Sequence, residues 1–213
     1  MMQVDFESVM KMTDERIIRV FQAIKDANLE SFLGDALSVC EPEVKQFVKN
    51  AVIDDDTVVS TVNGVEIRIN EELFAGMFNL PNEGPSSISD IPDEESEAML
   101  AVFGKEQLAK RSGKKADLKT EYRLLNDIVH RGLLAKEGAF DAYTEERFTL
   151  MTVIMQGIQF NWGSYLFTYF AAKFSNPTKK GQGYIAQISH IILSTPELVC
   201  KGKPTNFPRR IVN

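Results

Sequence analysis

The stretch from Thr57 to Pro81, TVVSTVNGVEIRINEELFAGMFNLP, constrains the fold more than any other part of the chain. Asn63-Gly64 suits a two-residue type I′ turn, because both central positions of that turn require a positive φ. On both sides of this dipeptide lie β-branched residues, and after it aliphatic residues alternate with charged ones, which is the period of a half-buried strand. The sequence therefore predicts a small antiparallel β-hairpin at about residues 57–69.

A short capped helix should follow the hairpin. The side chain of Asn70 can accept a hydrogen bond from an unpaired amide of a helix start, and Glu71 and Glu72 favour the positive end of the helix dipole. Pro81 ends this helical unit because it has no amide donor. The stripe expected to pack on the hairpin consists of Leu73, Phe74, Met77 and Phe78.

Most of the remaining chain shows the apolar spacing of helices, so the predicted fold class is mainly α, with the one hairpin packed on helices. The segments expected to be helical are 14–33, 42–51, 93–103, 116–131, 144–155, 162–174 and 181–194. Thr144 should cap one of these helices, and Gly157 should follow its end. Gly132 should interrupt the helix of residues 116–131, and the acidic run Asp54-Asp55-Asp56 should connect the helix of residues 42–51 to the hairpin. Buried stripes are expected at Trp162, Tyr165, Leu166, Tyr169, Phe170 and Phe174, and at Ile185, Ile188, Ile191 and Ile192.

The predicted domain organisation has three parts. Residues 1–40 form an N-terminal helical segment, residues 41–195 form the helical domain, and residues 196–213 form an extended basic tail. A chain of 213 residues with 44% apolar and 25% charged residues has the composition of an ordinary globular protein, with enough length for one sizeable core.

Cysteine usage and the N-terminus bear on the compartment. Cys40 and Cys200 lie far apart, with no cysteine or histidine at metal spacing, so we expect free thiols in a reducing compartment; a disulfide between them is the alternative. The N-terminus lacks the apolar region of a secretory signal, and no segment offers the about 20 apolar residues of a spanning helix. The expected location is intracellular, in the cytoplasm or nucleus, without a membrane.

An acidic segment, 83–97, is followed by a basic one, 105–119, which contains six lysines and arginines. The basic segment has two interpretations: a nucleic-acid contact or nuclear localisation patch, and a solvated linker between helical layers. The cations of the first interpretation are Lys110, Arg111, Lys114 and Lys115, joined by Arg209 and Arg210 of the tail. The lack of interleaved aromatic residues for base stacking and the net charge of −6 both favour the linker.

The sequence contains no recognisable catalytic constellation. His130 and His190 are the only histidines, and neither has a cluster of acidic residues or cysteines beside it at ligand spacing. Phosphate-binding glycine motifs, zinc-protease motifs and nucleophile-elbow motifs are all missing. The adjacent acid pairs fall at predicted helix starts, where they favour the helix dipole. We therefore predict no catalytic, cofactor or metal site, and no enzymatic activity.

The sequence order VKQFVKNAVI, VNGVEIRINEELFAGMFNLP, YRLLNDIVHRGLLAKEG and FTLMTVIMQGIQFNWGSYLF resembles the plant transposon protein domain, a family of uncharacterised, retroelement-associated plant sequences. The resemblance spans about residues 41–193 and is specific only in the hairpin unit, which is also similar to the plant mobile domain. The residues that carry it are Phe47, Asn50, Ala51, Val62, Gly64, Val65, Ile69, Asn70, Leu73, Leu80 and Pro81. The chain departs from the family at Val48-Lys49, where the family tends to have Tyr-Ala. The resemblance implies a mobile-element origin but no activity and no site residues.

Two functions from different classes follow. The leading hypothesis is a non-enzymatic interaction or structural module derived from a plant mobile element, acting through an unknown protein partner. The alternative is a nucleic-acid-binding accessory protein that uses the basic segment and the C-terminal tail. A residual nuclease or transferase is a third idea, for which no residue was found.

Overall fold

The computed structural model describes residues 4–34, 38–176, 180–201 and 204–206. Its α-helices are α1 (Phe6–Val9), α2 (Glu15–Asp26), α3 (Glu30–Gly34), α4 (Glu41–Asn50), α5 (Glu71–Met77), α6 (Asp93–Ala98), α7 (Leu100–Phe103), α8 (Thr120–Asp127), α9 (Glu145–Gln156), α10 (Trp162–Ser175) and α11 (Ile185–Leu193). Its strands are β1 (Ser38–Val39), β2 (Val52–Asp54), β3 (Thr57–Val62), β4 (Val65–Ile69), β5 (Gly113–Lys114), β6 (Ala142–Tyr143) and β7 (Thr205–Asn206). Two 3₁₀ turns, η1 (Ile88–Asp90) and η2 (Lys115–Asp117), and one π-helix, η3 (Ile128–Leu133), complete the elements.

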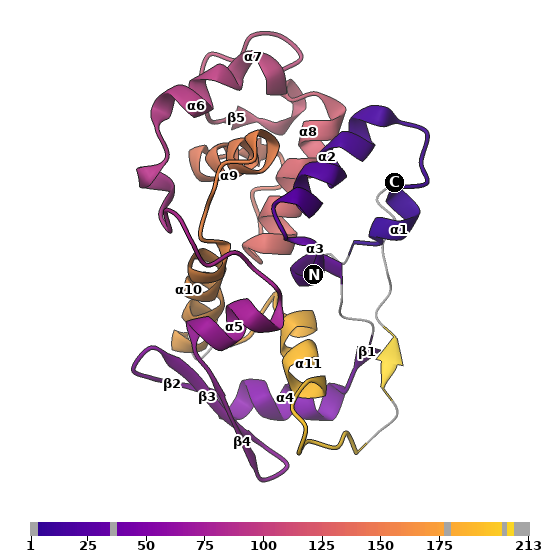
Figure 1. The fold of residues 1–213 in the computed structure, drawn as a ribbon, viewed down its shortest axis with the longest axis vertical. Coiled ribbons are helices and arrows are strands. Elements are labelled where there is room, and N and C mark those ends of the chain that lie inside the picture. The colour runs from indigo at the N-terminus through magenta and orange to yellow at the C-terminus, as the bar shows by residue number, and fades with distance from the viewer. Residues whose placement is uncertain (1–3, 35–37, 177–179, 202–203, 207–213) are drawn as a thin grey trace.

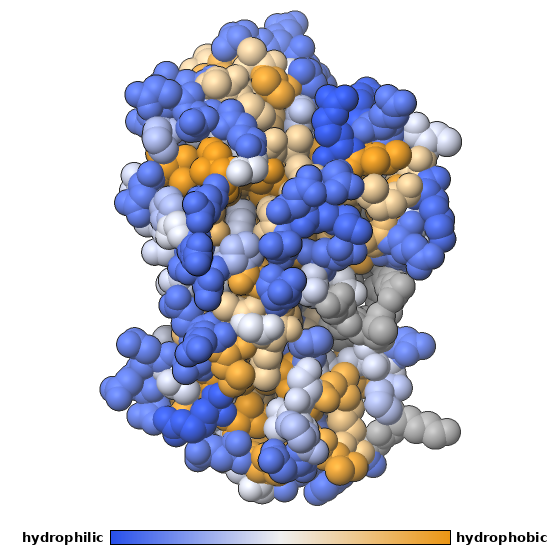
Figure 2. Space-filling model, viewed as in Figure 1, coloured by the Kyte–Doolittle hydropathy of each residue, from blue (hydrophilic) through white to orange (hydrophobic). Residues whose placement is uncertain are grey.

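The molecule is elongated and has two halves (Figure 1). In the upper half α9 contacts α2, α6 and α8, and in the lower half α10 packs on α5 and on the three-stranded sheet. The buried apolar residues nevertheless form one continuous cluster, which runs from Val4 to Leu198. Hydrophilic residues cover much of the face in Figure 2, with apolar patches between them. The predicted class, mainly α with small β elements, is confirmed.

The β-hairpin is confirmed. β3 and β4 pair antiparallel in a register that ends at Val62↔Val65, and the turn residues Asn63 and Gly64 have φ values of 51° and 86°. β2 adds a third strand on the other side of β3, which the sequence analysis did not predict. The pattern gave no sign of it because three residues are too few to show alternation, and because its last residue, Asp54, belongs to an acidic run that we assigned to a connection.

The capped helix is also confirmed, with one difference in its apolar stripe. Asn70 Oδ1 accepts a hydrogen bond from the backbone N–H of Leu73 at 2.9 Å, as an N-cap should. The rings of Phe74 and Phe170 lie 5.0 Å apart, so the buried side of α5 is centred on Phe74. Leu73 lies at the margin of that side and is 44% exposed, so the prediction that it packs on the hairpin is wrong.

Helices α9, α10 and α11 bury most of the residues expected. Thr144 Oγ1 accepts a hydrogen bond from the backbone N–H of Arg147, and Gly157 ends α9 with a left-handed φ of 64°. The aromatic stripe of α10 is core, with only Tyr169 partly buried. In α11 one predicted core residue, Ile185, is 37% exposed because it stands at the first position of the helix, while the three later isoleucines are buried.

The middle of the chain differs most from its predicted elements. The expected helix 93–103 is two short helices that meet at Met99. The expected helix 116–131 begins only at Thr120 and continues as a π-helix through Gly132, where we predicted an interruption. A Cβ atom at Gly132 would lie 2.6 Å from Leu33 Cδ2, so the glycine serves the close approach of two elements and does not end the helix.

Cys40 and Cys200 form a disulfide, so the prediction of free thiols is wrong. The disulfide had been only the alternative, because the two cysteines are 160 residues apart in sequence. The β1–β7 pairing and the start of α4 bring them to a Cα–Cα distance of 6.0 Å. Without free thiols the argument for a reducing compartment falls, and a cytoplasmic or nuclear location stays a prediction. In the part of the chain that the structure describes, no helix is both long and apolar enough to cross a membrane.

Candidate functional site

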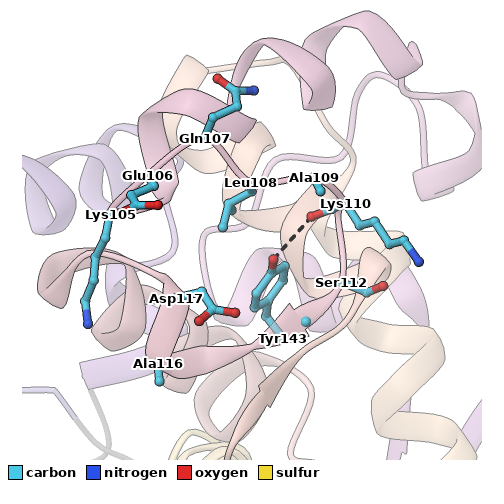
Figure 3. A pocket seen from close by; sticks show the side chains of 11 residues that line it. Lys105, Glu106, Gln107, Leu108, Ala109, Lys110, Ser112, Ala116, Asp117 and Tyr143 are labelled. Atoms are coloured by element: carbon cyan, nitrogen blue, oxygen red, sulfur yellow. Dashed lines mark hydrogen bonds between the residues drawn. The ribbon is translucent and has the colours of Figure 1, made fainter.

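The basic segment forms a loop around a cavity of 520 Å³ between α7 and β6 (Figure 3). Tyr143 lies at its centre and donates a hydrogen bond from its hydroxyl to the carbonyl oxygen of Lys110 at 3.2 Å. Leu108 and Asp117 also face the cavity, whereas the ammonium groups of Lys105 and Lys110 point away from it. The ammonium groups of Lys105 and Lys110 therefore do not point towards a common site for a phosphate.

Two of the predicted nucleic-acid contacts are engaged in ion pairs inside the molecule. The guanidinium of Arg111 binds Asp93 and Glu145, and the hydrogen bond from Arg111 to Asp93 raises the arginine pKa above its ordinary value. Lys115 Nζ lies 3.0 and 3.1 Å from the two carboxylate oxygens of Asp127. Part of the positive charge of the basic segment is thus neutralised by acidic side chains of the same chain.

The other predicted contacts are not brought together either. Lys110 and Lys114 are exposed and make no ion pair with any described residue. Arg209 and Arg210 lie outside the described residues. Of the predicted contacts, Lys110 and Lys114 therefore remain available, and the described residues of the basic segment do not form the convergent cationic face that nucleic-acid binding needs.

The two histidines and the one group of metal-type ligands have structural surroundings. The imidazole of His190 packs on the ring of Phe78, with centroids 5.2 Å apart, and His130 is buried in the π-helix. Among the described residues, Cys40, Glu43 and Cys200 are the only three ligand-type side chains close enough to share a metal ion. Metal binding needs thiolates, and the disulfide uses both sulfur atoms, so these residues do not fit a metal.

A groove with acidic rims lies in the lower half of the molecule, between the β2–β3 turn, the start of α5 and α10. The groove encloses 590 Å³ and is called here the acidic groove; its chief lining residues are Ile53, Asp55, Asp56, Glu71, Glu72, Phe167, Ala171 and Ala172. A hollow of 680 Å³ adjoins it along α5, where Leu73 and Met77 supply apolar surface. In Figure 2 the lower part of the molecule shows apolar surface bordered by hydrophilic residues.

The rims of the acidic groove carry negative charge that is not neutralised within the described structure. Its four carboxylates, from Asp55, Asp56, Glu71 and Glu72, form no ion pair with a described residue. Arg68 is the one cation that lines either hollow, and it binds Asp54 at 2.9 Å and Glu66 at 3.6 Å. The groove therefore combines an apolar floor with a surplus of negative charge.

Sequence reasoning missed this groove, although its four acids had been considered individually. The acids were assigned to a connection and to a helix dipole, and Leu73 was assigned to the core. The floor comes from α10, which follows the hairpin unit by about a hundred residues, so no local pattern could place it under these acids. The two groups of adjacent acids, Asp55-Asp56 and Glu71-Glu72, were the signal that the sequence offered.

None of the protein-family models, curated proteins or solved structures compared with the chain matches it. The resemblance to the plant transposon protein domain and to the plant mobile domain therefore stays a prediction. Function has to be argued from the geometry of this molecule.

Proposed function

We propose that the protein is a non-enzymatic interaction module that binds a basic, aliphatic-containing segment of a partner protein in the acidic groove. The observation that carries the proposal is the pairing of four unneutralised carboxylates with an apolar floor. A partner segment rich in lysine or arginine would complement the rims, and its aliphatic side chains would cover Ile53, which is 38% exposed, and the exposed Ala172.

The two parts of the groove would contribute in different ways. The exposed carboxylates attract a basic segment at long range, so they act mainly on the association rate and lose strength as salt rises. The floor supplies affinity, because burying one leucine or isoleucine side chain is worth about 1.5–3 kcal/mol. A cationic segment without an aliphatic residue should therefore bind weakly.

The acidic groove favours this function over nucleic-acid binding. Phosphates would be repelled by the carboxylates of Asp55, Asp56, Glu71 and Glu72. In the basic segment the guanidinium of Arg111 and the ammonium of Lys115 already bind carboxylates of this chain. A mobile-element ancestry remains part of the proposal, supported only by the resemblance of the hairpin unit.

Fluorescence anisotropy with a labelled heptapeptide tests the proposal. The peptide alternates lysine or arginine with leucine and isoleucine, and a control peptide carries aspartate and glutamate in place of the cations. The wild-type chain should bind the cationic peptide alone, and its affinity should fall as salt is raised. The double variant Glu71→Lys/Glu72→Lys should bind at least tenfold more weakly, since it reverses half of the rim charge.

The matched control is the double variant Glu94→Lys/Glu95→Lys. It reverses an equally exposed pair of acids at the start of α6, outside the acidic groove, and changes the net charge by the same amount. Unchanged binding by this variant would assign the effect to the groove. Equal loss in both double variants would show a response to overall charge alone and would reject the proposed site.

A further inference from the structure

A second polar cavity, of 280 Å³, lies where the start of α9 meets the end of α10. It is called here the Arg147 pocket, and the residues that matter for its chemistry are His130, Lys136, Thr144, Glu146, Arg147 and Lys173. They come from the π-helix, the following loop, the first turn of α9 and the last turn of α10. The sequence analysis assigned no function to any of them.

Arg147 is buried without a counter-ion. Its side chain belongs to a residue only 2% exposed, and no carboxylate of the described residues lies within 4.0 Å of its guanidinium. Nε donates to Thr144 Oγ1 at 3.3 Å, and the buried Nη1 has no hydrogen-bond partner in the described structure. An unpaired buried charge costs several kcal/mol, which points to a negatively charged occupant of the pocket.

The acids nearest to Arg147 are already occupied by other cations. Glu146 binds the ammonium of Lys136 and accepts hydrogen bonds from the hydroxyls of Tyr165 and Tyr169. Asp127 binds Lys115. Burial lowers the pKa of Arg147, and the more distant attraction of these two carboxylates only partly offsets that effect. The carboxylate of Glu137 also lines the pocket and accepts a hydrogen bond from Gln182 Nε2 at 2.7 Å. Among the described residues of the pocket, Arg147 Nη1 is therefore the buried donor left for an anion.

His130 adds a hydrogen-bond acceptor to the same pocket. Its Nε2 lies 2.7 Å from the carbonyl oxygen of Gly138, and because a carbonyl only accepts, Nε2 must carry the proton. In the neutral ring Nδ1 is then an acceptor, and it is buried without a partner. Burial, the largest influence, lowers the pKa of His130, so the neutral ring predominates near pH 7.

We propose that the Arg147 pocket binds a small oxyanion that carries a hydroxyl group, as monohydrogen phosphate does. One anionic oxygen would accept from Arg147 Nη1, and the hydroxyl would donate to His130 Nδ1. The N-terminal end of α9, a helix of 12 residues, adds its positive dipole end to the cavity wall. A volume of 280 Å³ admits a phosphate group and is below the range of larger ligands.

Isothermal titration calorimetry on the full chain, near neutral pH and at constant ionic strength, tests the proposal with inorganic phosphate. One saturable site per chain is expected at millimolar phosphate or below. Sulfate should bind several-fold more weakly, because it is fully deprotonated and cannot donate to His130 Nδ1. A phosphomonoester such as phosphoserine, titrated below its second pKa so that its phosphate keeps a hydroxyl, distinguishes a free ion from the phosphate end of a larger ligand. Tighter binding of inorganic phosphate favours the free ion, and tighter binding of phosphoserine favours the larger ligand. Both results support the pocket, provided that sulfate binds more weakly.

Variants at Arg147 decide whether binding occurs in this pocket. Arg147→Met should weaken phosphate binding at least tenfold, since a hydrogen bond to a charged group is lost. Arg68→Met removes an exposed arginine of the other half and should leave phosphate affinity unchanged. Arg147→Lys keeps the charge and serves if the methionine variant does not fold; it too should bind more weakly. Absence of saturable heat with the wild-type chain, equal binding of sulfate, or equal loss in Arg68→Met would overturn the proposal.

Discussion

The acidic groove and the Arg147 pocket show two ways in which one chain presents charge. The acids of the groove are exposed, and each also has a local role in a turn or at a helix start. The guanidinium of Arg147 is buried, lacks a counter-ion and is held by one threonine. Exposed charges cost little free energy of folding, and each can be substituted without affecting the others. A buried unpaired charge costs much more and depends on all the residues packed around it. The groove is therefore suited to an extended partner and the pocket to a small ligand.

The largest expected effect concerns the disulfide, which joins Cys40, before the start of α4, to Cys200, beyond α11. Reduction, or the variant Cys40→Ser, should lower the free energy of unfolding by about 5 kcal/mol, because a 160-residue loop is no longer closed in the unfolded chain. Urea unfolding with and without reductant measures this loss. Amide exchange should rise in α4 and near Cys200 more than in α9. A loss below about 1 kcal/mol would mean that the loop-closure model does not apply to this chain.

The two helix caps provide a matched pair, one in each half. Asn70→Ala and Thr144→Ala should each lower the free energy of unfolding by about 1 kcal/mol, because each leaves a first-turn amide without its acceptor. Only Thr144→Ala should also weaken phosphate binding, since Thr144 holds the guanidinium of Arg147. Chemical denaturation and calorimetry report the two quantities. If both variants bind phosphate with equal affinity, the side chain of Thr144 caps α9 but does not contribute to phosphate binding.

Acid should weaken the upper half through Glu146. Burial alone would raise the pKa of this carboxyl, but the hydrogen bonds from Lys136 and Tyr169 outweigh burial and hold the pKa below its ordinary value. Protonation then favours the unfolded chain, so this contribution is present above the unfolded pKa of about 4.3 and is lost as pH falls through the folded pKa. The free energy of unfolding, measured between about pH 6 and pH 3, should fall less steeply in Glu146→Gln. An identical pH dependence would contradict the assignment.

The smallest effect on stability is expected at the acidic groove. Leu73→Ala should change the free energy of unfolding by less than about 0.5 kcal/mol, because the side chain is 44% exposed. It should still weaken binding of the cationic peptide, since Leu73 supplies apolar surface to the adjoining hollow. Leu193→Ala, at an equally exposed leucine of α11, is the control and should bind normally. If Leu73→Ala binds the cationic peptide normally, the peptide contacts the acidic groove and not the adjoining hollow.

Features that depend on residues close together in the sequence were predicted correctly, whereas features that depend on distant residues were not. The turn at Asn63-Gly64, the caps at Asn70 and Thr144 and the end of α9 at Gly157 were all predicted, because each depends on atoms within a few residues. The break at Gly132 was predicted wrongly, because local rules treat glycine as an interruption and the close approach of Leu33 is not local.

The candidate sites were less predictable than the fold. The acids of the groove were recognised one at a time as helix-start and connection residues, and Phe167 and Ala171 of its floor were not among the residues that the sequence pattern singled out. No binding role was predicted for His130, yet its Nδ1 is buried without a hydrogen-bond partner in the described structure. The basic segment was the most recognisable candidate site in the sequence. In the structure two of its cations, Arg111 and Lys115, form ion pairs with carboxylates of the same chain.

The hairpin unit, the caps and the mainly helical class could be read from the amino-acid sequence, because backbone geometry and short-range periodicity specify them within a few residues. Three features required the folded molecule: the bond between Cys40 and Cys200, the exposure of Leu73 in the hollow that adjoins the acidic groove, and the burial of Arg147 with no acid of the described residues to pair with it. Each of these depends on which segments, often a hundred or more residues apart, come into contact. Such contacts result from the packing of one continuous core, and no local pattern encodes them.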